Sequence, residues 1–185
     1  MEDILIIPIG KIESDILTDI STAIEKIFHC RIEIGKGISV PRNSYHTRRR
    51  QYHSTDILKE MHALRKKVSE KMLGLTDVDL YVHDLNFVFG EADIAAGIAV
   101  ISLSRLKQEF YGLPPDIKLF HERAVKESIH ELGHTYGFNH CNNPRCIMYF
   151  SNTLRDTDVK GPGFCNICKE RLGISGNNKA LSGKG

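Results

Sequence analysis

The sequence predicts one α/β (or α+β) domain, and three observations support this. The chain opens with a strand, a helix and a second strand, the start of a βαβ unit. Longer stretches with apolar residues at helical spacing follow. The 185 residues, of which 41% are hydrophobic and 26% charged, are enough for one ordinary hydrophobic core. We therefore expect a single domain over residues 1–172 and a flexible polar tail over residues 173–185.

Short apolar patterns indicate the first three elements. Asp3 to Ile9 is a compact run rich in β-branched residues, which is typical of a buried, parallel strand. Alternation of isoleucine with charged residues predicts a second strand over Cys30 to Ile34. Cys30 fits a small buried hydrophobe at a helix–strand junction, with a redox role left open. The helix between them, Ser14 to Phe28, is predicted by the spacing of Ile16, Ile20, Ile24 and Ile27.

The next segment, Gly35 to His53, has no periodicity and is predicted to be a long surface loop. It contains the basic run Arg48 to Arg50. This run is either a solvated surface feature or a rim that attracts acidic peptides or a C-terminal carboxylate. His46 and His53 also lie here, but no ligand spacing supports a third metal site.

A long helix is predicted to begin at Ser54, which can cap it, with Asp56 in the first turn. The helix extends to about Leu73 and ends at Gly74. A short third strand is expected over Asp79 to His83. The apolar stripe of the helix, which we interpret as core packing, consists of Ile57, Met61, Leu64, Val68 and Met72.

The apolar segment from Phe87 to Leu103 suggests two strands. A turn is expected near Gly90 to Asp93, and a longer strand is expected from Ile94 or Ala96 to Leu103. After a Gly- and Pro-containing loop, Asp116 begins the longest predicted helix.

That helix carries the run H-E-L-G-H-T-Y-G-F-N-H, from His130 to His140. His130 and His134 lie four apart, so their imidazoles fall on one helix face and can hold a zinc ion. Gly137 can end the helix in a left-handed conformation and let His140 return as third ligand. Glu131 lies beside the metal as a general base. Three histidines and a water form an open, catalytic type of zinc site.

A second motif follows without a gap and has the pattern C-x4-C-x18-C-x2-C. Two close cysteine pairs separated by a loop are typical of a closed, structural zinc site, with two disulfides as the alternative. Residues 156–164 are predicted to be the loop between the pairs, and residues 165–172 a zinc knuckle with a short helix. The predicted ligands, within residues 141–168, are Cys141, Cys146, Cys165 and Cys168.

These runs carry a family resemblance. H-E-L-G-H-T-Y-G-F-N-H-C, followed by C-I-M at Cys146 and C-N-I-C at Cys165, resembles the archaemetzincins, a family of metzincin-type zinc metallopeptidases. The segment R-R-Q-Y-H-S-T-D-I-L from Arg49 is also similar to that family. The resemblance implies a metzincin-like zincin domain, in which a mixed, twisted sheet with an antiparallel edge strand packs on the active-site helix.

The resemblance also implies roles for particular residues. Met148 would be the methionine of a Met-turn beneath the catalytic ligands, and an edge strand around Gly97 to Ser102 would pair with a bound peptide. Glu131 would be the general base. The resemblance implies a catalytic zinc on His130, His134 and His140, and a structural zinc on the four cysteines.

Together these observations predict a zinc-dependent peptidase that holds two zinc ions and acts on peptides or proteins. Endopeptidase and aminopeptidase both remain open, since Glu91 or Asp93 could hold a substrate's amine. Tyr149 either lines the pocket or packs in the core. The alternatives are a zinc-stabilised binding module, which would contact protein or nucleic acid, and a pseudo-peptidase blocked by its own chain. Iron or cobalt could replace zinc at the histidines.

Net charge and composition limit the classes of binding partner and the compartment that we expect. A formal net charge of +2 gives no argument for nucleic acid or an anionic membrane. No apolar stretch approaches the length of a membrane span, and the N-terminus is acidic where a signal peptide is basic. Four of the five cysteines fit a zinc site in a reducing compartment. We expect a cytoplasmic protein, favour a monomer, and expect no nucleic-acid or membrane partner.

Overall fold

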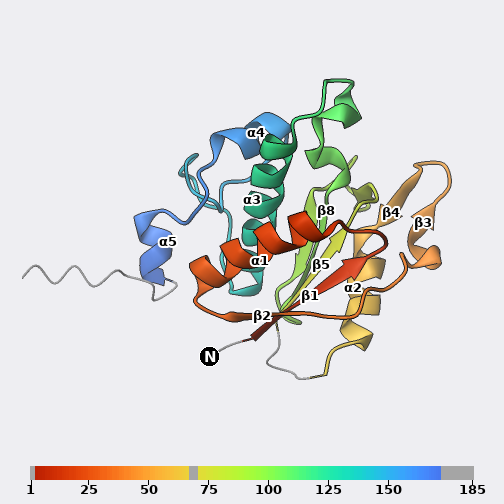
Figure 1. Ribbon diagram of the computed structural model, residues 1–185, viewed down its shortest axis with the longest axis horizontal. Coiled ribbons are helices and arrows are strands. Elements are labelled where there is room, and N and C mark those ends of the chain that lie inside the picture. Colours follow the sequence, from red (N-terminus) through yellow and green to blue (C-terminus); the bar gives the residue numbers. More distant parts are fainter. Residues whose placement is uncertain (1–2, 67–70, 172–185) are drawn as a thin grey trace, which may run out of the picture.

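A five-stranded mixed sheet forms the centre of the structure, a computed structural model that describes residues 3–66 and 71–171 (Figure 1). Neighbouring strands pair in parallel except for the last pair, which is antiparallel. The prediction of an α/β fold with a mixed sheet is confirmed. In spatial order the strands are β2 (Arg31–Ile34), β1 (Asp3–Ile9), β5 (Lys71–Thr76), β8 (Ile98–Ser102) and β7 (Gly90–Asp93).

Helices cover both faces of this sheet, and alternate residues along a strand point to opposite faces. In β1, Ile4 packs in the core beneath α1 (Ser14–Phe28) and α3 (Ile117–Thr135). Leu5, the next residue, packs in a second cluster against α2 (Ser54–Ala63). The sheet therefore lies between two hydrophobic cores, and α3 is held on one of its faces.

The predicted long helix from Ser54 to Leu73 is wrong in its second half. α2 ends at Ala63, and β5 begins at Lys71. A strand buried on both faces reads as an unbroken apolar run, so Met72, which belongs to β5, continued the helical stripe by coincidence. Val68, in the same stripe, lies outside the described residues.

The starts of the helices were predicted with mixed success. Asp116 caps α3 as expected, and its side chain accepts a hydrogen bond from the amide of Leu119 at 2.9 Å. Ser54 does not cap α2, because the cap position is His53. The Ser54 hydroxyl instead donates to the carboxylate of Glu91 and lies 3.1 Å from the carbonyl oxygen of Tyr81.

An antiparallel edge strand is present, but not in the expected segment. Residues 97–102 were predicted to form the edge, whereas β8 lies inside the sheet between β5 and β7. The segment Gly90–Asp93, predicted to be a turn, is the edge strand β7, and it pairs with β8. The turn lies one step later, at residues 94–97, where Gly97 has a φ of +69°.

A small second sheet occupies part of the predicted loop Gly35–His53. Within that loop, the Arg49 guanidinium donates to the carbonyl of Leu85 at 2.6 Å and lies 4.4 Å above the ring of Tyr81. Arg49 thus ties this sheet to the segment after Tyr81, while Arg48 and Arg50 are exposed. The strands are β3 (Tyr45–His46), β4 (Gln51–His53) and β6 (Leu80–Tyr81), the last shorter than predicted.

Two short helices complete the fold after α3. A loop was predicted over residues 156–164, but α4 (Leu154–Val159) occupies residues 156–159 of it. This helix begins with a capping box made by Thr153 and Asp156. α5 (Asn166–Arg171) is the short helix expected after Cys165. The predicted tail, residues 173–185, lies outside the described residues. Three 3₁₀ helices are η1 (Arg42–Ser44), η2 (Ser104–Leu106) and η3 (Gln108–Tyr111).

Gly74→Ala tests the position of β5. A Cβ at Gly74 would lie 2.6 Å from Sδ of Met61 and 2.9 Å from Cδ1 of Ile9. We expect this substitution to lower the free energy of unfolding by about 1–3 kcal/mol because it overpacks the second core. Chemical denaturation measures it. Gly163→Ala is the matched control, since its Cβ would meet no atom within 4 Å; equal stability of both variants would contradict the structure.

Candidate metal centre and pocket

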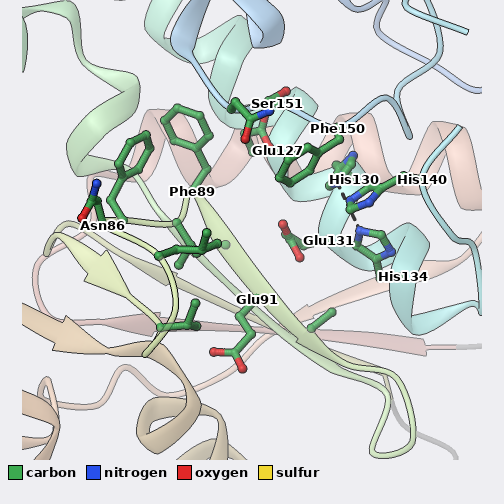
Figure 2. Close-up of a pocket in the computed structure, with 17 residues that line it drawn as sticks. Asn86, Phe89, Glu91, Glu127, His130, Glu131, His134, His140, Phe150 and Ser151 are labelled. Atoms are coloured by element: carbon green, nitrogen blue, oxygen red, sulfur yellow. Dashed lines mark hydrogen bonds between the residues drawn. The ribbon is translucent and has the colours of Figure 1, made fainter. Parts of the chain in front are cut away.

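The end of α3 and the turn after it bring three histidines together. His130 and His134 lie one helical turn apart on α3, which ends at Thr135. Gly137 then adopts a φ of +81°, in the left-handed region that favours glycine. The chain reverses there and returns His140 to the other two rings, as predicted. One ring nitrogen from each histidine lies within 4.8 Å of the others (Figure 2).

Hydrogen bonds to backbone carbonyls set the tautomers of two of these histidines. Nδ1 of His130 lies 2.8 Å from the carbonyl oxygen of Ile147, and Nδ1 of His134 lies 2.7 Å from that of Phe138. A carbonyl only accepts, so each Nδ1 carries the proton. Burial also lowers the pKa of both rings, that of His130 well below its ordinary value, which favours neutral imidazoles.

The two Nε2 atoms therefore carry lone pairs, and they lie only 3.1 Å apart. Two lone pairs at this distance cannot form a hydrogen bond with each other and instead suit a shared cation. Histidines that bind metals commonly donate their other ring nitrogen to a carbonyl in this way. The three histidines thus fit a metal ion.

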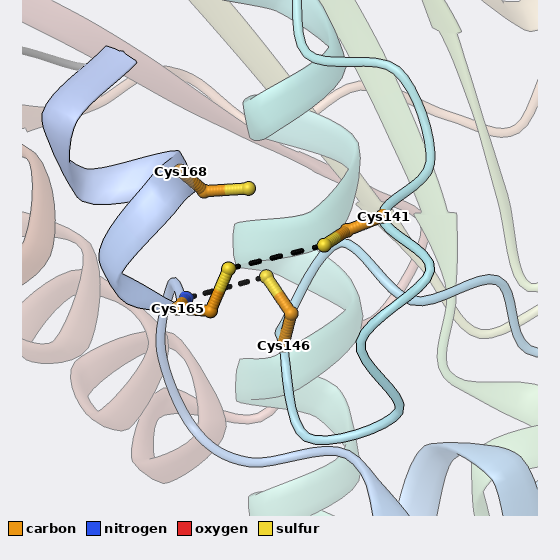
Figure 3. A group of neighbouring side chains, drawn as sticks. All are labelled: Cys141, Cys146, Cys165 and Cys168. Carbon is orange, nitrogen blue, oxygen red and sulfur yellow. Dashed lines mark hydrogen bonds between the residues drawn. The ribbon is translucent and has the colours of Figure 1, made fainter.

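The four cysteines form a second cluster, in which all Sγ atoms lie within 4.8 Å of one another (Figure 3). Sγ of Cys141 and Sγ of Cys165 are 3.8 Å apart, far longer than a disulfide bond of about 2.05 Å. The backbone amide of Cys168 lowers the pKa of Cys165 to about 7. Four converging thiols, one of them easily ionised, also fit a metal ion.

Glu131 projects into the pocket beside the histidines (Figure 2). It is 7% exposed, and burial raises its pKa to about 8, with a smaller contribution from Glu127. A Cβ at Gly90 would lie 2.5 Å from Cγ of Glu131 and 2.7 Å from the carbonyl oxygen of Val100. Glycine at this position of β7 therefore leaves the space that the Glu131 side chain occupies.

The pocket has a volume of about 410 Å³ and is built from four segments of the chain. β7 and the residues just before it form one wall, and α3 forms the other. His140 and residues 150–152 close the end. The sequence analysis considered Tyr149 for this lining, but the pocket is lined by the next residue, Phe150, whose ring lies 4.6 Å from that of His140.

The structure also locates three other residues for which the sequence suggested a role or a position. Met148 is fully buried and packs against α3 at Gly133, between the two histidines of the helix. Cys30 is buried at the junction of α1 and β2, as expected. Glu91 lines the pocket, and its carboxylate accepts hydrogen bonds from the hydroxyls of Ser54 and Thr55.

The sequence analysis missed a buried ion pair next to this site. Nζ of Lys160 lies 2.9 Å from Oε1 of Glu127, and both side chains are almost completely buried. Glu127 lines the pocket and lies one helical turn before Glu131. Its position on the predicted helix face was a usable clue, whereas Lys160 stands in an apparently polar loop with no pattern to mark it.

Comparison with known proteins now identifies the family, because the model of Peptidase family M54 matches residues 5–173. The chain belongs to that family, the archaemetzincins. It is 44% identical over 181 residues to the archaemetzincin of Pyrococcus furiosus, covering 92% of this chain and 94% of the relative. The family match makes the protein a zinc-dependent metallopeptidase that acts on peptides or proteins.

Solved structures agree with this assignment. The zinc-dependent peptidase of Methanocorpusculum labreanum superposes with a TM-score of 0.85 at 29% identity, over 91% of this chain and 99% of that one. The archaemetzincin of Archaeoglobus fulgidus, complexed with malonate, gives a TM-score of 0.79 at 36% identity over the same shares. The metzincin-like fold is thereby confirmed. Among the described residues, no helix is both long and apolar enough to cross a membrane.

Glu131→Gln tests the burial of Glu131 in the metal-free protein. The folded pKa of about 8 exceeds the ordinary value of 4.5, so the folded chain binds a proton that the unfolded chain releases between these pH values. Stability contributed by Glu131 therefore falls as pH rises from about 4.5 to about 8. A neutral glutamine should raise the free energy of unfolding at pH 7 by at least about 1 kcal/mol.

The measurement is chemical denaturation in chelator at pH 5 and pH 7. Glu60→Gln, at an exposed position, is the control and should leave stability nearly unchanged. A Glu131→Gln protein less stable than wild type at pH 7 would contradict the burial of this carboxyl group.

Proposed function

We propose that His130, His134 and His140 hold the catalytic zinc and that Glu131 is the general base. One observation carries this proposal. Two neutral imidazoles present their unprotonated nitrogens 3.1 Å apart, beside a third histidine and a buried carboxyl group that faces an open pocket. Such an arrangement suits a three-histidine site with room for water and substrate.

The chemistry then divides between the metal and the chain. Bound zinc would lower the pKa of a water molecule towards about 7 and polarise the scissile carbonyl. Glu131 takes the proton from the attacking water and delivers it to the leaving nitrogen of the peptide bond. A carboxylate beside the attacking water can serve in both steps, first as the base and then, once protonated, as the acid.

We further propose that the peptide binds in extended form along β7. This strand is at the edge of the sheet and lines the pocket opposite α3. An edge strand offers backbone donors and acceptors that an added strand can use. Glu91 is already bonded to two hydroxyls, and Asp93 accepts from the amide of Ala96 at 2.9 Å. Each carboxylate keeps further acceptor sites, so either acid could still hold an α-amine, and the positions of cleavage would distinguish an endopeptidase from an aminopeptidase.

The four cysteines would hold a second, structural zinc. Cys141 directly follows His140, and its amide donates to the carbonyl of Met148 at 2.9 Å. Ile147, whose carbonyl fixes His130, directly follows Cys146. A closed metal site at the cysteines therefore stabilises the segment that positions two of the three histidines. The domain of residues 1–172 would then act as one catalytic unit.

Glu131→Ala tests the role of the base. Zinc-loaded wild type should cleave members of a diverse peptide library, and the variant should lose about 100-fold or more of that rate while it keeps its zinc. Mass spectrometry measures the products, and elemental analysis measures the metal. Loss of the histidine-bound zinc in the variant would mean that its role is misassigned. Glu60→Ala, at an exposed position, should retain the activity.

Cys168→Ser tests the structural site. We expect zinc content to fall from two ions to one and the free energy of unfolding to fall by several kcal/mol, with little change in the positions of cleavage. Elemental analysis and chemical denaturation measure these effects. Cys30→Ala, which changes the cysteine outside the cluster, should keep both ions. An equally stable, metal-replete Cys168→Ser protein would argue against a four-cysteine zinc site.

A further inference from the structure

The pocket extends past His130 to a floor that the proposed reaction does not use. This floor is formed by Glu127, from α3, and Ser151, from the segment after Met148. In Figure 2 both labelled side chains lie at the end of the pocket away from His134, with Phe89 to one side and Phe150 to the other. Glu131 and the histidines lie in the same pocket, towards the end where Figure 2 shows His134.

The Glu127 carboxylate is held by two groups behind the pocket. Its Oε1 atom lies 2.9 Å from Nζ of Lys160 and accepts a hydrogen bond of 2.8 Å from the hydroxyl of Thr157. Lys160 is only 1% exposed and does not line the pocket. The pair therefore presents a carboxylate to the pocket while its charge is compensated from behind.

Stability alone does not explain this pair. Taking both charges out of water costs several kcal/mol per ion, and an apolar pair of similar volume is often as stable. A compensated carboxylate in a pocket wall is, however, a strong hydrogen-bond acceptor that does not require a cation as its partner.

The second group of the floor is short of a partner. Oγ of Ser151 is shielded from solvent, and no group among the described residues forms a hydrogen bond with it. A buried hydroxyl without a partner costs about 1–3 kcal/mol. Because Oγ is shielded, the Ser151 side chain must rotate towards the pocket before a ligand atom can bond to it and remove this cost.

The walls above the floor are aromatic. The rings of Phe87 and Phe89 meet edge to face at 5.2 Å, and Phe150 stands across the pocket against His140. No lysine or arginine is among the described residues that line it. An acidic side chain of the substrate at this floor would be repelled by Glu127. A basic side chain would lose its hydration and would face a carboxylate whose charge Lys160 already compensates.

We propose that this part of the pocket is a side-chain subsite that selects tyrosine in the peptide substrate. The ring would pack between the phenylalanines, and the phenol group would donate to Glu127 and accept from Ser151, since a phenol is both donor and acceptor. This inference rests on the proposed peptidase function and adds a substrate preference to it.

The test compares peptides that differ only at the residue next to the cleaved bond, which is tyrosine, phenylalanine, arginine or glutamate. Tyrosine and phenylalanine differ by one hydroxyl group. A site built to bond that hydroxyl should favour tyrosine in kcat/KM by about tenfold or more, and both charged residues should be cleaved more slowly than tyrosine. A tyrosine to phenylalanine ratio within about twofold would overturn the proposal.

Variants of the floor locate the source of the preference. Ser151→Ala should reduce the tyrosine to phenylalanine ratio several-fold. The double variant Glu127→Leu with Lys160→Met replaces the whole ion pair by apolar groups, avoids leaving an unpaired buried charge, and should bring the ratio near one. Ser14→Ala, at an exposed position on α1, is the control and should keep the wild-type ratio. Unchanged ratios in both floor variants would overturn the assignment.

A binding measurement separates this inference from the peptidase proposal. In zinc-loaded Glu131→Ala protein, the tyrosine peptide should bind more tightly than the phenylalanine peptide, as measured by calorimetry. Preferential binding together with no cleavage by wild type would support the subsite and overturn the proposed reaction. Cleavage without any preference in rate or binding would overturn the subsite and leave the reaction standing.

Discussion

Two hydrogen bonds from histidine side chains to backbone carbonyls determine the geometry of the site. The helix α3 supplies the spacing of His130 and His134, but a helix alone does not decide which ring nitrogen faces the pocket. The carbonyls of Ile147 and Phe138 decide it, because each takes the Nδ1 proton. Both carbonyls belong to the chain beyond α3. The tautomers of the two histidines are therefore a product of tertiary structure, and they depend on the segment that also carries the cysteines.

The same dependence explains the tight packing around α3. Gly133 lies between the two histidines of the helix, and a Cβ there would collide with the sulfur of Met148. The segment that follows Cys146 can thus approach the helix closely enough for the carbonyl of Ile147 to reach His130. On the opposite side, Lys160 reaches the same helix at Glu127. The residues between the cysteine pairs therefore contact α3 at positions before and after His130. The cysteine cluster and the histidine cluster thus share one support.

The parts of the fold that could be predicted are those with a local physical cause. Asp116 and Gly137 mark the ends of the long helix region because capping and left-handed backbone have strict residue preferences. The histidine and cysteine clusters could be predicted from spacing. The packing of Met148 beneath the histidines could be predicted only from the family resemblance. β5 could not be predicted, because a strand covered on both faces has no alternation. Lys160 could not be predicted either, since its burial depends on a partner 33 positions earlier in the chain, at Glu127.

The wrongly predicted edge strand has a different cause. The sequence G-E-A-D of β7 suggests a turn, because glycine and aspartate disfavour strands. Yet Gly90 lies where any side chain would meet Glu131 and the backbone of Val100, and Glu91 bonds to the start of α2. Both residues serve the pocket at the expense of strand propensity. Local sequence rules fail where a site imposes its own requirements. The turn-like sequence of β7 forms an edge strand beside the helix that carries the histidines, which agrees with our proposal that the peptide binds along it.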